Sequence, residues 1–174
     1  MSILSKKTVF TSNYFKVVQK VIKRNGKTFT KDIIERNSSV LIIAYTKDDI
    51  YLESQYRDSL EKVNIEIVQG TVDADDDPLE TAKRELHEEV GLIAKKWKKL
   101  AEWDLSAVLN AKQYVFAATD LEETEQHLEF DEEIEIMKMP IKQVLEKIDM
   151  GEITTASHIA ALLLFDKMRK EGKF

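Results

Sequence analysis

Three glutamates in the middle of the chain have the spacing of a metal-binding or acid–base site. Glu85, Glu88 and Glu89 stand at positions i, i+3 and i+4, so a helix through them would place all three carboxylates on one side of a single turn. Like charges at this spacing repel one another, and the negative end of the helix dipole adds to that cost. A divalent cation bound by carboxylate oxygens would offset both effects. The alternative is a solvated acidic face that nearby lysine and arginine side chains screen.

Residues 70–92 supply the helix that would position these carboxylates. Pro78 suits the first helical position, where its missing N–H has no helical partner, and Gly91 suits the left-handed residue just past the end. An acidic loop, residues 73–77, precedes the helix. Apolar residues recur at helical spacing and predict the buried face: Leu79, Ala82, Leu86 and Val90. Because a solvated face does not need all these features together, the pattern favours a site for a hard cation.

This stretch resembles the Nudix box, the signature of hydrolases that cleave a nucleoside diphosphate linked to another moiety. The box consists of G, five residues, E, seven residues, and then R-E-U-x-E-E-x-G-U, where U is a bulky aliphatic residue. The positions that match in register are Gly70, Arg84, Glu85, Leu86, Glu88, Glu89, Gly91 and Leu92. Asp76 stands where the box has its first glutamate. Over most of its length the chain is similar to the ADP-ribose pyrophosphatase branch of this family.

The resemblance implies an α/β (α+β) Nudix fold, in which a mixed β-sheet is sandwiched between helices, with an N-terminal β-hairpin unit. We expect residues 1–37 to form the N-terminal strand unit, which in similar enzymes takes part in dimer formation, and residues 38–174 to form the Nudix hydrolase domain. Residues 14–36 alternate around Asn25-Gly26, which predicts a hairpin. The alternative for this hairpin is the edge of a single sheet.

The rest of the chain contains further predicted strands and two predicted helices. We expect residues 40–45 to form a buried strand that pairs with residues 50–56 as a hairpin, and residues 97–103 and 112–118 to form two more strands. Pro140 should open a short helix that ends near Gly151, and a last helix should run from about residue 156 to residue 170. Its predicted apolar stripe consists of Ile159, Ala160, Leu163 and Met168.

Aromatic residues and histidines outside the box are expected to have structural roles. Trp97 and Trp103 are predicted to anchor the core rather than stack on a base. Tyr14 and Phe15 are also expected to pack in the core, with stacking on a nucleotide base in a dimer as the alternative. The three histidines show no metal-ligand spacing and are expected to be structural: His87, His127 and His158.

The resemblance also implies which residues bind metal. Glu85, Glu88, Glu89 and the backbone carbonyl of Gln69 would hold Mg²⁺ or Mn²⁺, and Glu85 would also count among the catalytic residues. In the family the motif arginine pairs with the first glutamate of the box. Arg84 would therefore pair with Asp76 and steady the loop without touching substrate.

The resemblance also implies a catalytic glutamate and a substrate-binding arginine. In the family an acidic loop delivers a catalytic glutamate to the metal site, and aligning the segment EEIEIMKMP places Glu132 there, with Glu129 and Glu133 as alternatives. Glu132 would act as general base or orient the attacking water. Arg57 would contact a phosphate or a ribose, because a guanidinium offers fork geometry to such oxygens, and Glu66 matches a family glutamate before the box. The alternative for Arg57 is a surface arginine without a role.

We therefore expect a metal-dependent pyrophosphohydrolase that cleaves the diphosphate of ADP-ribose or a nucleoside diphosphate sugar to a nucleoside monophosphate and a sugar phosphate. The alternative is a Nudix-fold nucleotide-binding or sensor module with little or no hydrolysis. Ser106 and its neighbours stand where enzymes specific for ADP-ribose commonly carry a proline. The sequence thus leaves the exact substrate open, since one fold serves many substrates.

Composition limits the remaining classes of protein. The 174 residues are 43% hydrophobic, which allows one compact domain with a small appended element. The absence of cysteine excludes disulfides, a thiol nucleophile and cysteine-ligated zinc. A formal charge of -6 argues against a nucleic-acid partner, and no apolar run is long enough to span a bilayer. We expect a soluble cytoplasmic protein that acts on a small molecule, and the resemblance implies a homodimer.

Overall fold

The computed structural model describes residues 1–128, 130 and 133–174. Its elements in chain order are β1 (Ser2–Thr11), β2 (Phe15–Arg24), β3 (Lys27–Arg36), β4 (Ser38–Ala44), β5 (Asp49–Arg57), β6 (Lys62–Glu66), β7 (Val68–Val72), α1 (Pro78–Val90), β8 (Leu92–Asp104), β9 (Leu109–Asn110), β10 (Lys112–Glu123), β11 (Ile134–Pro140), α2 (Ile141–Asp149) and α3 (Ala156–Lys170). The described strands form sheets with the orders β1-β2-β3-β9, β7-β4-β10-β8 and β11-β5-β6.

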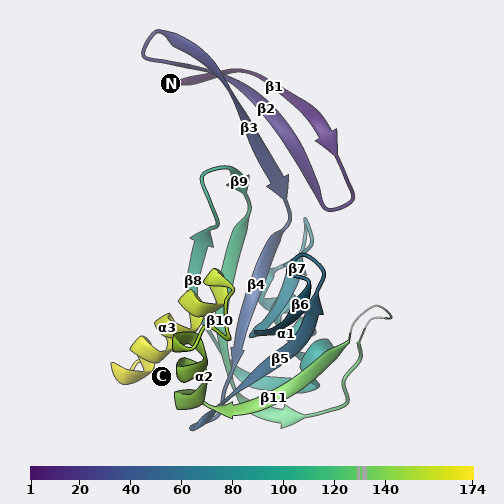
Figure 1. The fold of residues 1–174 in the computed structure, drawn as a ribbon, viewed down its shortest axis with the longest axis vertical. Coiled ribbons are helices and arrows are strands. Elements are labelled where there is room, and N and C mark those ends of the chain that lie inside the picture. The colour runs from purple at the N-terminus through teal and green to yellow at the C-terminus, as the bar shows by residue number, and fades with distance from the viewer. Residues whose placement is uncertain (129, 131–132) are drawn as a thin grey trace.

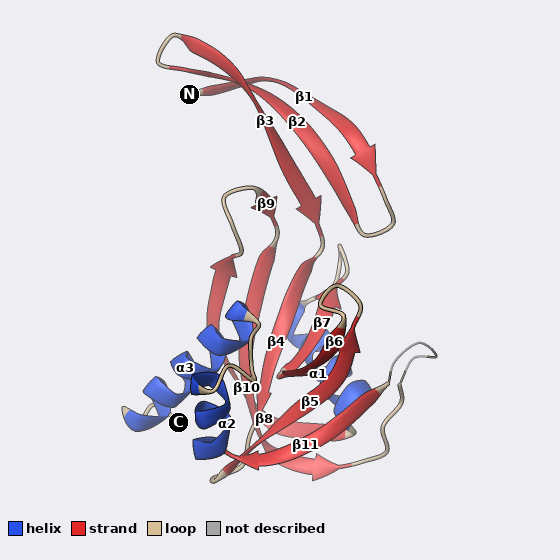
Figure 2. Ribbon diagram, viewed as in Figure 1, coloured by secondary structure: helices blue, strands red, loops and turns tan. Residues whose placement is uncertain are grey.

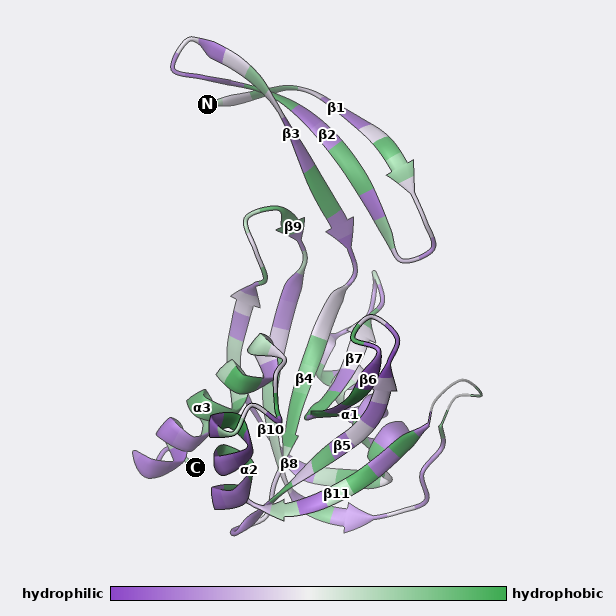
Figure 3. Cartoon of the chain, viewed as in Figure 1, coloured by the Kyte–Doolittle hydropathy of each residue, from purple (hydrophilic) through white to green (hydrophobic). Residues whose placement is uncertain are grey.

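The sheet β7-β4-β10-β8 lies at the centre of the body and is covered on both faces (Figures 1 and 2). β4 and β10 run parallel, whereas β7 and β8 pair antiparallel to them. Val40 and Ile42 pack with α1, and Leu41 and Ile43 pack with α3 on the opposite face. A strand buried on both faces explains the unbroken apolar run of β4 (Figure 3). This arrangement confirms the expected mixed sheet between helices.

The predicted hairpin of residues 40–45 and 50–56 is wrong. β5 pairs with β11 and β6 in another sheet, and an isolated bridge between Tyr45 and Ile50 is what joins it to β4. Both neighbours of β4 come from later in the chain, because β7 and β10 pair along its two edges. β5 and its sheet pack on the α3 side of the body together with α2.

Local signals place α1 where the sequence predicts it. Pro78 is its first residue, and the Asp77 carboxylate accepts hydrogen bonds from the N–H groups of Leu79 at 2.8 Å and Glu80 at 3.3 Å. Gly91 ends the helix in the left-handed conformation, with φ 66° and ψ 39°. The predicted buried face is also present, because Ala82, Leu86 and Val90 lie in the core under the central sheet, with Leu79 packed against it.

The last two helices begin and end near their predicted bounds, but the predicted apolar stripe of α3 is only partly right. Ile159 packs against the core as predicted, whereas Ala160 is exposed and Leu163 is 50% exposed. The buried residues on this face are Ala161, Leu162 and Phe165. Apolar residues occupy almost every position from 159 to 165, so periodicity alone could not select one face. No helix in the described ranges combines the length and hydropathy needed to cross a membrane.

The N-terminal strands form their own sheet, which stands away from the body (Figure 1). β2 and β3 form the predicted hairpin, with Asn25 at φ 50° and Gly26 at φ 75° in its turn. β1, which the sequence did not predict, pairs along β2, and β9 pairs with β3 at Ile34 and Glu35. The hairpin is therefore not an edge of the central sheet. The domain boundary at residues 37 and 38 stays a prediction.

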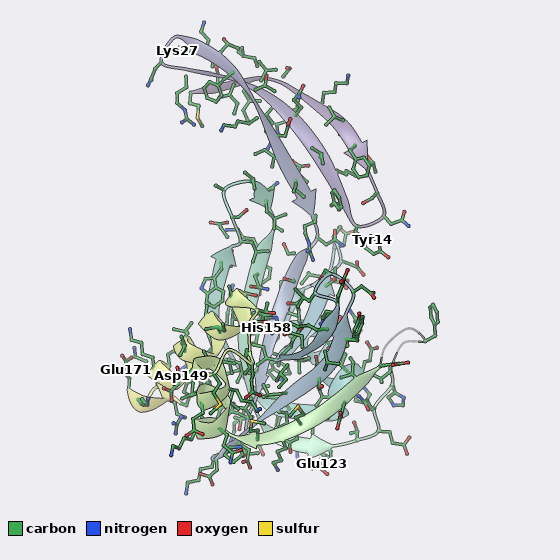
Figure 4. The ribbon with its side chains drawn as sticks, in the orientation of Figure 1. Tyr14, Lys27, Glu123, Asp149, His158 and Glu171 are labelled. Carbon is green, nitrogen blue, oxygen red and sulfur yellow. The ribbon has the colours of Figure 1, made fainter. Side chains whose placement is uncertain are left out.

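The aromatic residues divide between the two parts of the molecule. Trp97 and Trp103 pack partly buried against the core clusters, as predicted. Tyr14 is 85% exposed in the turn after β1, so the expected core packing is wrong for this residue (Figure 4). Phe15 is 38% exposed and belongs to neither core cluster, so the expectation is wrong for it as well; its ring lies 5.6 Å from that of Phe10, measured between centroids.

Candidate active site

A cavity of about 450 Å³ lies beside α1 and collects several of the residues singled out in the sequence. Its walls come from β5, β7, α1 and the loop between β7 and α1. The lining residues are Arg57, Gln69, Gly70, Thr71, Asp73, Asp76, Arg84, Glu85 and Glu89. Two of the three box glutamates therefore share one concave site with Gln69 and Arg57. Glu88 is half-buried on the same helix, outside this lining.

Gly70 makes room for the glutamate that faces it. A Cβ atom at this position would lie 2.1 Å from Cγ of Glu85, far inside van der Waals contact. The glycine of the box thus lets the Glu85 side chain lie directly on the backbone of β7. Glu85 keeps 12% of its side chain exposed, and Glu89 is 7% exposed as a residue. Both glutamates are therefore largely buried residues that line the cavity, and Glu85 lies against β7.

Arg84 pairs with the helix glutamates and not with Asp76. Its guanidinium donates to Glu85 at 2.8 Å and to Glu88 at 2.9 Å. Burial lowers the pKa of Arg84, but these carboxylates outweigh it and raise the pKa overall. Within the described ranges no ion pair joins Arg84 to Asp76, so the predicted pairing is wrong. The physical reason is proximity, because Glu85 is adjacent in sequence and Glu88 lies one turn further along the helix.

Arg57 is held at the rim of the cavity by a buried acid. Its Nε donates to Glu66 at 3.0 Å and its Nη2 at 2.8 Å, a fork that also raises the pKa of Arg57. Burial raises the pKa of Glu66, yet hydrogen bonds from Arg57 and Asn64 lower it overall. Asn64 donates to Glu66 at 2.7 Å and to Thr155, the residue just before α3, at 3.0 Å. A third of the Arg57 side chain stays exposed, so the guanidinium remains open to a ligand.

His158 joins α3 to β7 inside the body (Figure 4). It is 1% exposed, its Nδ1 accepts the backbone N–H of Ile67 at 3.2 Å, and its Nε2 lies 3.0 Å from Oε1 of Gln69. Burial lowers the pKa of His158 to about 4. The nearby charge of Glu66 raises this pKa, but the effect of burial is larger. The predicted structural histidine is therefore a neutral hydrogen-bonding group behind the cavity wall.

The described flanks of the acidic loop lie at the C-terminal end of α1. The backbone N–H of Thr124 donates to the carbonyl of Gly91 at 2.7 Å, and the backbone N–H of His127 donates to the backbone carbonyl of Glu88 at 2.8 Å. The rings of His127 and His87 lie 5.4 Å apart, measured between their centroids. Because these bonds occupy carbonyls at the helix end, they tie the chain before the loop to the helix that carries the box glutamates.

Two of the three glutamates proposed in this loop, Glu129 and Glu132, lie outside the described residues. Glu133 is described and exposed, in the segment just before β11. The roles predicted for these glutamates remain predictions.

The donors around the cavity fit a hard divalent cation. Glu85 and Glu89 offer carboxylate oxygens, and Gln69, whose backbone carbonyl is the predicted fourth donor, lines the same cavity. Among the residues that the structure describes, no three acidic, histidine or cysteine side chains form a ready-made metal cluster. Glu85 and Glu88 accept hydrogen bonds from Arg84 in this arrangement, so their side chains would have to reorient toward an ion.

Comparison with known proteins settles the family. The family model described as the NUDIX domain matches residues 35–160, most of the chain. The chain belongs to the Nudix family. This confirms the resemblance seen in the box, and the protein is a Nudix hydrolase. The structure places the residues of the box together: Gly70 faces Glu85, and the three box glutamates lie on α1.

Three named relatives cover most of this Nudix chain. It is 29% identical over 164 residues to the ADP-ribose pyrophosphatase of Bacillus subtilis (strain 168), covering 91% of this chain and 89% of the relative. It is 29% identical to the ADP-ribose pyrophosphatase of Mycobacterium tuberculosis, covering 92% and 80%. It is 28% identical to the methanol dehydrogenase activator of Bacillus methanolicus, covering 79% and 77%. A solved ADP compounds hydrolase has the same fold, with a TM-score of 0.87, 22% identity and coverage of 99% and 96%.

Sequence reasoning missed several polar residues around this Nudix site. Glu53 is 1% exposed on β5, directly opposite Glu66 in the β5–β6 pair, and it helps to raise the pKa of Arg57. A single acid at the end of the apolar run in β5 was the available signal for Glu53. Asn64, Thr155 and the role of His158 left no such signal, because their partners are about 90 residues away in sequence.

Proposed function

We propose that this Nudix hydrolase is a metal-dependent pyrophosphohydrolase that cleaves the diphosphate of ADP-ribose or a nucleoside diphosphate sugar. Its products would be a nucleoside monophosphate and a sugar phosphate. The observation that carries the proposal is the cavity beside α1, which combines the acids Glu85 and Glu89 with the charged guanidinium of Arg57. The two relatives named ADP-ribose pyrophosphatases make ADP-ribose the first substrate to test.

Mg²⁺ or Mn²⁺ is the proposed cofactor, with Glu85, Glu88, Glu89 and the carbonyl of Gln69 as its ligands. When bound, such an ion shields the charge of a diphosphate and makes a nearby water more acidic. Arg84 donates to both Glu85 and Glu88, so its ion pairs must rearrange before these carboxylates face an ion. The released guanidinium would lie on the cavity wall, close to an anionic substrate.

The remaining steps depend on the chain's own groups. Arg57 would donate its free N–H groups to a phosphate or ribose oxygen while Glu66 holds the rest of its fork. Glu132 would take the proton of the attacking water as an oxygen–phosphorus bond forms and the bond to the leaving phosphate breaks. Glu132→Gln should therefore lower kcat more than Glu129→Gln or Glu133→Gln does, and equal effects would contradict this assignment.

The substrate is tested with a panel. We would measure nucleoside monophosphate release from ADP-ribose, several nucleotide sugars, dinucleoside polyphosphates and nucleoside triphosphates, each with Mg²⁺ or Mn²⁺ and with a chelator. Metal-dependent turnover of ADP-ribose or a nucleotide sugar is the expected result. Absence of turnover, together with a raised melting temperature on adding nucleotide, would contradict it and favour the binding or sensor module.

The N-terminal sheet supports the proposal of a homodimer through residues 1–37. A small sheet needs a second packed layer, yet Val18 is the buried apolar residue among its described strands. Its exposed apolar side chains are Ile3, Leu4, Val9, Phe10, Phe15 and Ile34. A second copy of the chain would cover this surface. Tyr14, exposed in the turn after β1, would then be open to stack on a nucleotide base.

A further inference from the structure

The backbone of Ile67, between β6 and β7, fixes the position of the proton on the buried histidine behind the cavity. The N–H of Ile67 donates to Nδ1 of His158, so this nitrogen must present a lone pair and cannot carry hydrogen. The hydrogen of the neutral ring then lies on Nε2, which faces the side chain of Gln69 at 3.0 Å. His158 is consequently a donor toward Gln69.

This donor orients the amide of Gln69. An N–H group needs an acceptor, so Oε1 of Gln69 turns to His158 and the NH₂ group points away from it. Among the described residues this NH₂ group makes no hydrogen bond, and Gln69 is half-buried on the lining of the cavity. A rotated amide would place two donors against the histidine N–H, so the His158 contact holds one orientation only.

We infer that the side-chain amide of Gln69, and not only its backbone carbonyl, binds the substrate, with His158 as the residue that positions it. Its ligand is an anionic phosphate oxygen, because Arg57 and Arg84 line the same cavity and a neutral N–H donor beside them complements a diphosphate. Gln69 and Arg57 line the same cavity, so both can donate to the bound ligand. This inference rests on the proposed function, since it assigns a further contact in the same site.

The first experiment removes the donor without removing its volume. Gln69→Met keeps the backbone carbonyl and should weaken binding of α,β-methylene-ADP in the presence of Mg²⁺ about 10-fold, the usual value of a hydrogen bond to a charged group. With a hydrolysed substrate the same variant should raise KM about 10-fold and change kcat less than about 2-fold. Unchanged binding would overturn the inference.

His158→Asn tests the positioning step. The shorter amide can still accept from the Ile67 N–H but does not extend to Gln69, so KM should rise, by less than in Gln69→Met. The double variant Gln69→Met/His158→Asn should have the same KM as Gln69→Met alone. If His158→Asn acted through independent structural damage, the KM of the double variant would be higher than that of Gln69→Met. Leu162→Ala is the matched control, because Leu162 is buried on the same helix and contacts the core: its melting temperature should fall while KM stays constant.

A spectroscopic measurement separates this inference from the proposed function. Long-range ¹H–¹⁵N spectra of the His158 ring in the full chain should show the Nε2–H tautomer, and an Nδ1–H tautomer would overturn the inference. If wild type turns over no member of the substrate panel, the proposed hydrolase function fails. The tautomer and the binding of α,β-methylene-ADP by wild type and Gln69→Met would still decide the inference.

Discussion

At the scale of single residues, the geometry around Gly70 makes a sharp prediction. An alanine Cβ there would lie 2.1 Å from Cγ of Glu85, so Gly70→Ala must move the carboxylate off β7. We expect kcat/KM to fall at least about 10-fold, as for other displacements of a catalytic group by about 1 Å. Gly151→Ala is the matched control: its φ of 72° makes alanine strained and costs about 1 kcal/mol, but the site is untouched. Equal activities of the two variants would contradict the assignment of Glu85.

Arg57 gives a second prediction at this scale. Lysine keeps the charge but cannot form the two-bonded fork to Glu66, so Arg57→Lys leaves the group poorly placed at the cavity rim. KM should rise about 10-fold with a smaller change in kcat, as measured by steady-state kinetics on the best substrate of the panel. Arg169→Lys on α3, which pairs with Asp166 away from the cavity, is the control. An unchanged KM in Arg57→Lys would remove Arg57 from the substrate contacts.

The residue scale also shows where sequence reasoning stops. Two of the three box glutamates, Glu85 and Glu89, line the cavity, because their spacing on one helix is local information that the sequence carries. The box could not predict the partner of Arg84, since several carboxylates lie within reach of one long side chain and geometry chooses among them. The contacts of His158 depend on folding that brings α3 against β7 across 89 residues of sequence.

At the scale of elements, helix ends were predictable and strand partners were not. The bounds of α1 depend on Asp77, Pro78 and Gly91, whose preferences act within one turn. The partners of β4 depend on which distant strands pack beside it, and two buried apolar strands look alike in sequence. The face of α3 was only partly predicted for a related reason, because almost every position from 159 to 165 is apolar.

The contact between α3 and β7 makes stability depend on pH. Burial lowers the pKa of His158 to about 4 from 6.5, so the unfolded chain binds more protons than the folded chain between these values. Stability is therefore fully present above about pH 6.5 and falls as the pH drops toward 4, by up to about 3 kcal/mol. Urea unfolding with chelator at several pH values measures this. His158→Asn should lose most of the dependence in this window, and an equally steep dependence in that variant would contradict the account.

At the scale of the whole molecule, the exposed N-terminal sheet predicts association. Phe10 is 51% exposed on β1 and contacts Phe15, in a sheet that no described helix covers (Figure 3). We expect a dimer in analytical ultracentrifugation, and Phe10→Lys should shift it toward monomer because a buried charge opposes association. Met150→Lys, at an exposed position on the body, should leave the dimer intact. A monomeric wild type would contradict the proposed interface.

The overall fold was predictable only in part. The resemblance to the Nudix box implied a mixed sheet between helices, which the fold confirms. The separate N-terminal sheet was only partly predicted, because its β1 strand gave no strong pattern and its contact with β9 comes from a distant segment. The substrate remains a proposal, since a shared fold does not determine the ligand.

The most direct test is the hydrolysis of ADP-ribose by wild type, Glu89→Gln and Glu80→Gln, with Mg²⁺ and with chelator. Glu89 lies in the cavity, whereas Glu80 is exposed in the first turn of the same helix and pairs with Lys83. We predict metal-dependent AMP release by wild type and Glu80→Gln, and a loss of at least about 100-fold in Glu89→Gln. Full activity of Glu89→Gln, or activity that survives the chelator, would contradict a metal-dependent site at this cavity.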